Sequence, residues 1–246
     1  MSRKWSQSRC NSAIFALFVS VTSLGFLHSV PSAVAKTLMP ATLLEIEKSY
    51  QKADTLEAKF EQNKKIESFG REKKSEGVVR FKRPSKFRWE TFEPDPGVLV
   101  SDGRTFWHYT PPFDETDSGQ LLIRKSTEVQ SEFARALLSG RFSSLKGLKI
   151  ADLSRGRFAL TPAAGSAGNV IRALLEIDLK AKLIHRVTLE HEGGNKTDIF
   201  LSQIELGKTL SEEMFVFQAP ERTRIVDESV SESSGKKTPA PKKMSH

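Results

Sequence analysis

The stretch GVVRFKRPSKFRW, residues 77–89, decides the fold because apolar and charged side chains alternate on both sides of a proline-containing turn signal. Val79 and Phe81 alternate with basic residues before the turn, and Phe87 and Trp89 do so after it. A two-residue period is that of a β-strand, and proline beside serine marks a turn. The stretch therefore predicts a β-hairpin with one apolar face.

The same pattern extends outward in both directions. Leu56, Ala58 and Phe60 alternate with polar residues before the hairpin, and a charged connection from residue 63 to 76 joins them to it. Glycine-containing turns such as residues 101–103 and 193–195 separate the later segments. The further predicted strands are 97–101, 105–109, 120–125, 147–152, 157–161, 170–178, 183–190, 197–206 and 214–218.

Two segments read as helices. Thr42 and Glu45 have capping-box spacing, and apolar residues follow at helical spacing to Ala53. A second segment opens at Thr127, carries Val129, Phe133 and Leu137 on one stripe, and stops at Gly140. Many short strands with two helices predict a mainly β protein with helices (α+β). We expect a strongly curved antiparallel sheet, an incomplete barrel, with the helices closing its concave side.

The two ends differ from the middle. Residues 1–35 have a basic start, an apolar run and Ala33-Val34-Ala35, which is typical of a signal peptide cleaved after Ala35. An uncleaved anchor would lack a cleavage motif, and a lipid anchor would need cysteine at the cut, whereas the one cysteine is Cys10. We therefore expect export from the cytoplasm, a domain at 36–228 and a disordered basic tail at 229–246.

Charge and cysteine content limit the function classes. Of the formal net charge of +8, the segment 1–35 and the tail contribute three each, which leaves about +2 on the domain. Nucleic-acid binding is therefore not expected, because such proteins concentrate a basic face. Cleavage would also remove the one cysteine, so a packed core rather than disulfides must stabilise the domain.

No motif for catalysis occurs. The sequence has no nucleophile elbow, P-loop or dinucleotide fingerprint, so an enzyme is not expected. Alternation puts His185 and His191 on one face, where a zinc site is conceivable, but no third ligand is indicated. The acidic cluster at 114–117 lacks calcium-loop spacing and reads as a solvated loop.

Three motifs occur in order between residues 56 and 112. They are Phe60-Glu61-Gln62, the hairpin GVVRFKRPSKFRW at 77–89, and VSDGRTFWHYTP at 100–111. Together they resemble the LolA family of periplasmic lipoprotein carriers, and residues 215–220 resemble the family's last core strand. The resemblance implies an incomplete barrel with a helical lid over an apolar cavity, and acylated lipoproteins as cargo. It also implies loading by an inner-membrane ABC-type complex, unloading to an outer-membrane acceptor, a monomer and no cofactor.

The resemblance also implies site residues. Alternation points Arg83 to the same face as Phe81, and in the family the matching arginine holds the lid shut; a surface arginine before proline is the alternative. Phe106 and Trp107 must face opposite ways, so one lies on the outer face. Ordinary core packing is the alternative role for every wall residue. The candidates for the cavity wall are Tyr50, Leu56, Phe60, Phe81, Phe87, Trp89, Phe106, Trp107, Phe133 and Leu137.

Two rival functions stay open. A relative on the same scaffold could sense lipoproteins or carry other lipids, and a secreted enzyme of unknown type belongs to a different class. A polar cavity with converging carboxylates and histidines would favour the enzyme. An apolar cavity with Arg83 at its edge would favour the carrier.

Overall fold

The computed structural model describes residues 39–129 and 132–229. The chain divides into residues 1–36 and 37–246, and all described residues belong to the second unit. The expected signal peptide at 1–35 and nearly all of the expected tail at 229–246 lie outside the described residues. No described helix is both long and apolar enough to cross a membrane.

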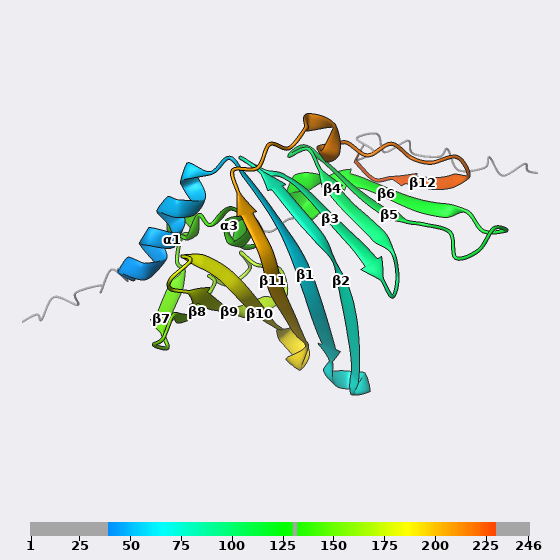
Figure 1. The fold of residues 1–246 in the computed structure, drawn as a ribbon. Coiled ribbons are helices and arrows are strands. Elements are labelled where there is room, and N and C mark those ends of the chain that lie inside the picture. The colour runs from blue at the N-terminus through cyan, green and yellow to red at the C-terminus, as the bar shows by residue number, and fades with distance from the viewer. Residues whose placement is uncertain (1–38, 130–131, 230–246) are drawn as a thin grey trace, which may run out of the picture. The chain divides into compact units, whose positions relative to one another are not determined.

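One sheet dominates the described residues (Figure 1). Its strand order is β12-β6-β5-β4-β3-β2-β1-β11-β10-β9-β8-β7. No pairing between the edge strands β12 and β7 occurs in this part of the chain, so the sheet is open rather than a closed barrel. The strands are β1 Thr55–Ile66, β2 Arg71–Lys82, β3 Lys86–Glu93, β4 Gly97–Ser101, β5 Thr105–Thr110, β6 Gly119–Lys125, β7 Lys149–Asp152, β8 Arg157–Thr161, β9 Val170–Asp178, β10 Leu183–His191, β11 Lys196–Leu206 and β12 Thr223–Asp227.

The longest hairpin overturns one expectation. Residues 63–76, expected to be a connection, instead form the distal half of β1 and β2, joined by the 3₁₀ turn η1 Glu67–Phe69. The register is continuous from Thr55 opposite Lys82 to Ile66 opposite Arg71. Apolar alternation was the signal for a strand. It fades here because both faces of this half carry polar residues.

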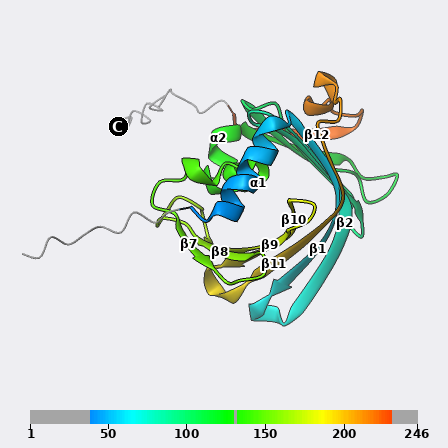
Figure 2. The same ribbon diagram turned by 60° about the vertical axis from the view of Figure 1, so that its left-hand side comes forward.

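The helices lie on the concave side of the sheet. Figure 2 shows the sheet curving around α1 Ala41–Lys52, and the second helical segment is α2 Ser126–Val129 and α3 Glu132–Ser139. The predicted capping box is wrong, because Pro40 is the residue before the first turn and no side chain caps it. The predicted stop is confirmed: α3 ends at Ser139 and Gly140 is left-handed, with φ of 64°.

The C-terminal part differs from expectation. The predicted strand 214–218 is wrong, because residues Glu212–Phe215 form the 3₁₀ helix η4 and the following residues are irregular. Phe215 is fully buried, so its apolar signal was one of packing rather than of strand pairing. The last strand, β12, runs parallel to β6, whereas the other described strand pairs are antiparallel.

The sheet carries apolar residues on both faces. On the concave face Leu43 and Ile46 of α1 are buried in the main core with Phe60 of β1. The segment around η4 crosses the outer face, where Lys82 Nζ donates to the Leu210 carbonyl at 3.2 Å and Phe217 stacks on Tyr109 at 5.0 Å. The curved sheet is thus covered on both sides near α1, but its distal β1–β2 hairpin is not.

Gly140 allows α1 and α3 to approach closely. A Cβ built on Gly140 would lie 2.8 Å from the Tyr50 Cβ, closer than side-chain carbons approach. Its positive φ also favours glycine. The contact between the two helices therefore requires glycine at this position.

We expect Gly140→Ala to lower the free energy of unfolding by more than a loop glycine does. Left-handed strain costs about 1–2 kcal/mol, and forcing Tyr50 aside adds about 1–3 kcal/mol. Gly165→Ala is the matched control, because Gly165 has φ of 75° and no atom within 4 Å of its Cβ position. Urea unfolding of both variants measures the difference, and equal losses would show that the helices do not meet at Gly140.

Candidate functional site

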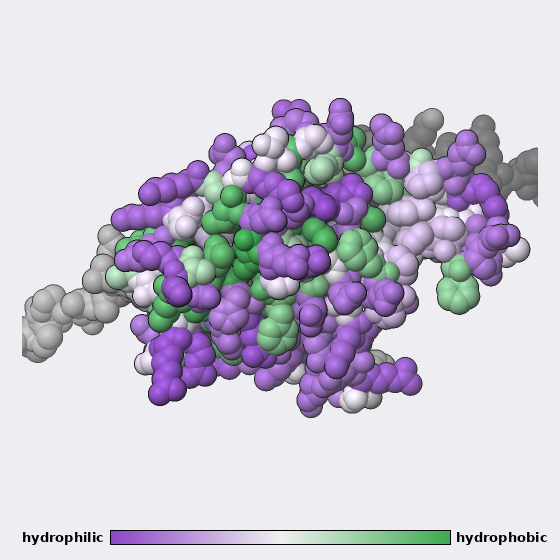
Figure 3. Space-filling view, viewed as in Figure 1, coloured by the Kyte–Doolittle hydropathy of each residue, from purple (hydrophilic) through white to green (hydrophobic). Residues whose placement is uncertain are grey.

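An apolar pocket of about 220 Å³ lies between the helices and the concave face of the sheet. Figure 3, viewed as in Figure 1, shows a mostly polar surface with apolar side chains lying among the polar ones near its centre. Strands β1–β4, β10 and β11 supply the walls, and α1 and α3 supply one residue each. The lining residues are Tyr50, Leu56, Val79, Phe81, Phe87, Trp89, Leu99, Leu137, Ile184, Val187, Leu189, Ile199 and Leu201.

Six of the ten residues expected in a cavity wall line this pocket: Tyr50, Leu56, Phe81, Phe87, Trp89 and Leu137. Phe60 and Phe106 lie beside it, where they stack on Trp89 at 4.0 Å and on Phe87 at 6.1 Å. Phe133 is fully buried in the core, and Trp107 faces away on the same side as Tyr109.

Sequence reasoning missed the opposite wall. Ile184, Val187 and Leu189 of β10 and Ile199 and Leu201 of β11 line the pocket. The apolar residues of β10 and β11 alternate with polar ones within the predicted strands. This alternation does not predict that they lie across the pocket from β1 to β4. A register shift between Ile184 and Arg186 reverses the alternation along β10, so that Ile184 and Val187, three residues apart, both face the pocket. No pattern in the sequence revealed this shift.

Tyr50 fixes α1 to the far wall. Its hydroxyl accepts a hydrogen bond from the Ile184 backbone N–H at 3.1 Å, and burial raises the pKa of Tyr50. At the other end of α1, Glu45 pairs with Lys182 of the β9–β10 turn at 2.8 Å. The helix therefore spans the concave face instead of projecting from it.

Arg83 joins the C-terminal ends of both helices. Its Nε donates to the Ala53 carbonyl at 2.8 Å, and its Nη2 donates to the carbonyls of Ser139, at 2.8 Å, and of Tyr50. Carbonyls in the last turn of a helix lack regular partners within the helix and carry partial negative charge. Burial, and next the nearby Arg141, lower the pKa of Arg83, while Asp54 opposes the shift.

Glu47 is a contact that the sequence did not reveal. This carboxylate of α1 is 4% exposed. It accepts hydrogen bonds from the Ser143 backbone N–H at 3.1 Å, from the Ser143 hydroxyl and from Gln51 Nε2 at 2.8 Å. Ser143 lies in η2 Phe142–Ser144, directly after α3, so Glu47 ties the two helical segments together a second time.

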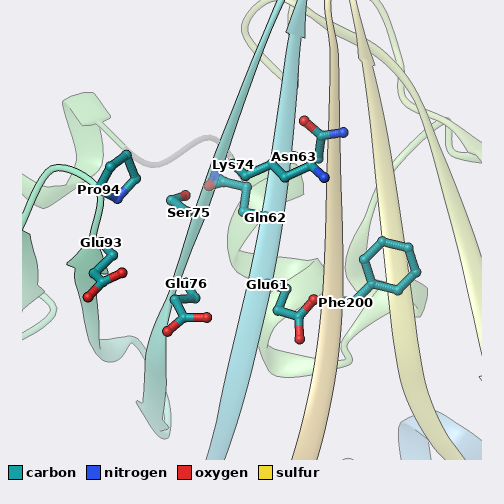
Figure 4. A pocket seen from close by; sticks show the side chains of 9 residues that line it. All are labelled: Glu61, Gln62, Asn63, Lys74, Ser75, Glu76, Glu93, Pro94 and Phe200. Atoms are coloured by element: carbon teal, nitrogen blue, oxygen red, sulfur yellow. The ribbon is translucent and has the colours of Figure 1, made fainter.

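A second hollow, of about 480 Å³, is polar and lies along the distal part of β1, β2 and β11 (Figure 4). Glu61 lies directly opposite Glu76, and Glu76 opposite Glu93. In the described residues no group of three or more histidine, cysteine or acidic side chains could hold a metal ion. The described side chains of this hollow therefore offer no metal site.

The histidine pair and the acidic cluster at 114–117, the two groups considered for metal binding in the sequence, contact neighbouring protein groups instead. His191 Nδ1 lies 3.2 Å from Asn169 Oδ1 and its Nε2 lies 3.2 Å from Thr197 Oγ1. The register shift at Ile184 separates His185 from the face of His191. Asp114 accepts hydrogen bonds from the backbone and hydroxyl of Thr116 and from the Asp117 N–H. This is the pattern of a self-bonded turn.

Curated relatives match most of the chain. An outer-membrane lipoprotein carrier protein of Pseudomonas aeruginosa is 28% identical over 229 residues, which cover 87% of this chain and 99% of the relative. A protein of the same name from Azotobacter vinelandii is 27% identical over 206 residues, covering 80% and 96%. The chain thus aligns with nearly the whole length of both relatives.

Solved structures give a weaker likeness. A LolA-superfamily protein of Nitrosomonas europaea is 12% identical, with a TM-score of 0.41, over 71% of this chain and 97% of that one. A Pseudomonas aeruginosa MucA/MucB complex matches at 16% identity and a TM-score of 0.40, over 75% of this chain and 62% of that one.

The family comparison is the most direct. The family model described as outer membrane lipoprotein carrier protein LolA matches residues 51–218, which include β1 to β11 and most of the pocket wall. This match covers more than half of the chain. The chain therefore belongs to the LolA family.

Proposed function

We propose that the protein is a periplasmic carrier that holds the acyl chains of lipoproteins in the apolar pocket and takes them from the inner to the outer membrane. The observation that carries the proposal is the pocket itself, whose thirteen lining residues are all aliphatic or aromatic. Membership of the LolA family and the name of the relatives support the same cargo.

The energetics favour a closed container for such cargo. Burying one methylene group is worth about 0.8 kcal/mol, so a long acyl chain gains on the order of 10 kcal/mol. A chain of this kind does not cross water unaided. Walls of leucine, isoleucine, phenylalanine and tryptophan replace the membrane interior while the cargo is in transit.

The pocket must enlarge to accept this cargo. Its volume is about 220 Å³. Ordinary ligand sites are larger, because they start at roughly 300 Å³. Since β-strands are held by their neighbours, we propose that α1 and α3 are the lid that moves. Tyr50 and Leu137, the two helical residues in the lining, would then leave the pocket together.

Arg83 is then the latch of this lid. Its three carbonyl partners belong to the ends of α1 and α3, so opening the lid breaks these bonds. Hydrogen bonds to charged groups are each worth about 1.5–3 kcal/mol, and half-exposure reduces that value. The latch therefore opposes loading and favours release by an amount smaller than the gain from one acyl chain.

The remaining parts of the proposal concern the route. Export would depend on the signal peptide predicted at 1–35. An inner-membrane ABC-type complex would load the carrier and an outer-membrane acceptor would unload it. The protein would work as a monomer without a cofactor.

Ile199→Gln tests the pocket. This residue lines the pocket, whereas Phe200 next to it lies on the outer face over Arg186. An unpaired amide in an apolar pocket costs about 1–3 kcal/mol, so binding of a fluorescent fatty-acid-like probe should weaken by roughly tenfold. Phe200→Gln is the control and should bind as wild type does; equal effects of the two variants would place the probe elsewhere.

Arg83→Leu tests the latch. It removes the three bonds but keeps an apolar stem, so the lid should open more often, and acylated lipoprotein should still load. Transfer to the acceptor should slow by about tenfold or more, because release no longer gains the latch bonds. Arg83→Lys keeps one charge without the guanidinium fork and should be intermediate. Transfer by the leucine variant at the wild-type rate would show that the Arg83 bonds do not control the lid.

A further inference from the structure

We propose that the open end of the concave face is a cationic subsite, built by Lys64, Lys73, His108 and His191, that binds an acidic side chain close to the acylated end of the cargo. This inference rests on the proposed function, because it assigns a second part of the cargo to the same cavity. It concerns which acylated peptides bind best.

The concave face changes from apolar to polar along β1, β2, β10 and β11. On β1 the inward positions run from Leu56, Ala58 and Phe60 to Gln62 and then Lys64. On β2 they run from Phe81 and Val79 past Gly77 to Ser75 and Lys73. On β10 and β11 the pocket residues Leu189 and Ile199 are followed by His191 and Thr197.

His108 lies opposite the pocket residue Leu99, so it belongs to the concave face together with Lys64, Lys73 and His191. Lys64 lies directly opposite Lys73 in the β1–β2 ladder. His108 comes from β5 on one side of β1, and His191 comes from β10 on the other. Desolvation, and next the Lys64 charge, lower the pKa of both His108 and His191.

Lys64 is left without an anion. It makes no hydrogen bond or ion pair with any residue that the structure describes, and within the same residues Lys73 pairs only with Asp95. Like charges opposite each other destabilise a ladder. Desolvation followed by the Lys73 charge lowers the pKa of Lys64. On the outer face of the same strands, by contrast, Arg80 is paired with both Glu57 and Glu90.

The arrangement suits a ligand with an apolar end and an anionic group. Lys64 lies four residues beyond Phe60 on the same strand. Strand geometry makes this separation about 13 Å, so a group just outside the acyl-filled pocket reaches the lysine. Desolvation lowers the pKa of both histidines, which favours their neutral forms. They offer hydrogen bonds while the lysines supply the charge, and a carboxylate in the first residues after the acylated end meets both requirements.

Two synthetic lipopeptides test this inference. Both carry the same acyl chains, and their first peptide residues are either Ser-Asp-Asp or Ser-Asn-Asn. Each displaces the fatty-acid-like probe from the purified protein. Wild type should prefer the acidic peptide by about two- to fivefold, the range for charge pairs near a surface, and high salt should reduce the preference.

The variants separate the subsite from the pocket. Lys64→Gln should lose the preference but keep the wild-type response to the neutral lipopeptide, which also shows that it is folded. Lys59→Gln is the matched control, because Lys59 is an exposed lysine on the outer face of the same strand, and it should keep the preference. Loss of the preference in the Lys59 variant as well would overturn the assignment to Lys64.

Two other outcomes distinguish failure of the subsite from failure of the proposed carrier function. Equal displacement by the two lipopeptides in wild type overturns the subsite but leaves the proposed carrier function intact, whereas no displacement by either overturns both. The same displacement assay is also run with phosphatidylglycerol, which is anionic, and phosphatidylcholine, which has no net charge, both with identical acyl chains. A preference for the anionic lipid without one for the acidic lipopeptide would assign the subsite to a lipid headgroup and overturn the inference as stated.

Discussion

The structure depends on how the two helical segments are held over an apolar concave face. The sheet is open, so its curvature alone does not remove that face from water. The guanidinium of Arg83 supplies the link, because its three hydrogen bonds end on carbonyls of α1, the residue after it and α3. Carbonyls at a helix C-terminus lack regular partners within the helix, so one side chain both satisfies them and fixes the helices to the end of β2.

Glu47 and Gly140 show that this closure is specified at more than one place. The buried Glu47 carboxylate holds η2, and Gly140 lets the ends of α1 and α3 meet. All three contacts involve polar groups or close backbone approach rather than apolar burial. Breaking them therefore costs hydrogen bonds, while the apolar surfaces they hold together remain able to bind another apolar partner. That division suits a lid better than a permanent core.

Periodicity in the sequence predicted most strands, because a sheet with one apolar face imposes a two-residue pattern. It failed at residues 63–76, where both faces of the β1–β2 hairpin are polar, and at 214–218, where Phe215 packs from a 3₁₀ turn. The aromatic part of the pocket wall was predictable from residues 56–89. The wall from β10 and β11 was not, because it depends on long-range pairing and on a register shift after Ile184.

The polar half of the β1–β2 hairpin, which apolar alternation did not predict, makes the two ends of the concave face chemically different. At the end near α1 the face is apolar and covered, and at the end near Lys64 it is polar and cationic. An acyl chain gains free energy only in the first region, whereas a charged peptide is tolerated only in the second. The orientation of an amphiphile on this face is therefore set before any specific contact forms. In the proposed carrier, the soluble part of the cargo would lie at the end of this face opposite Arg83.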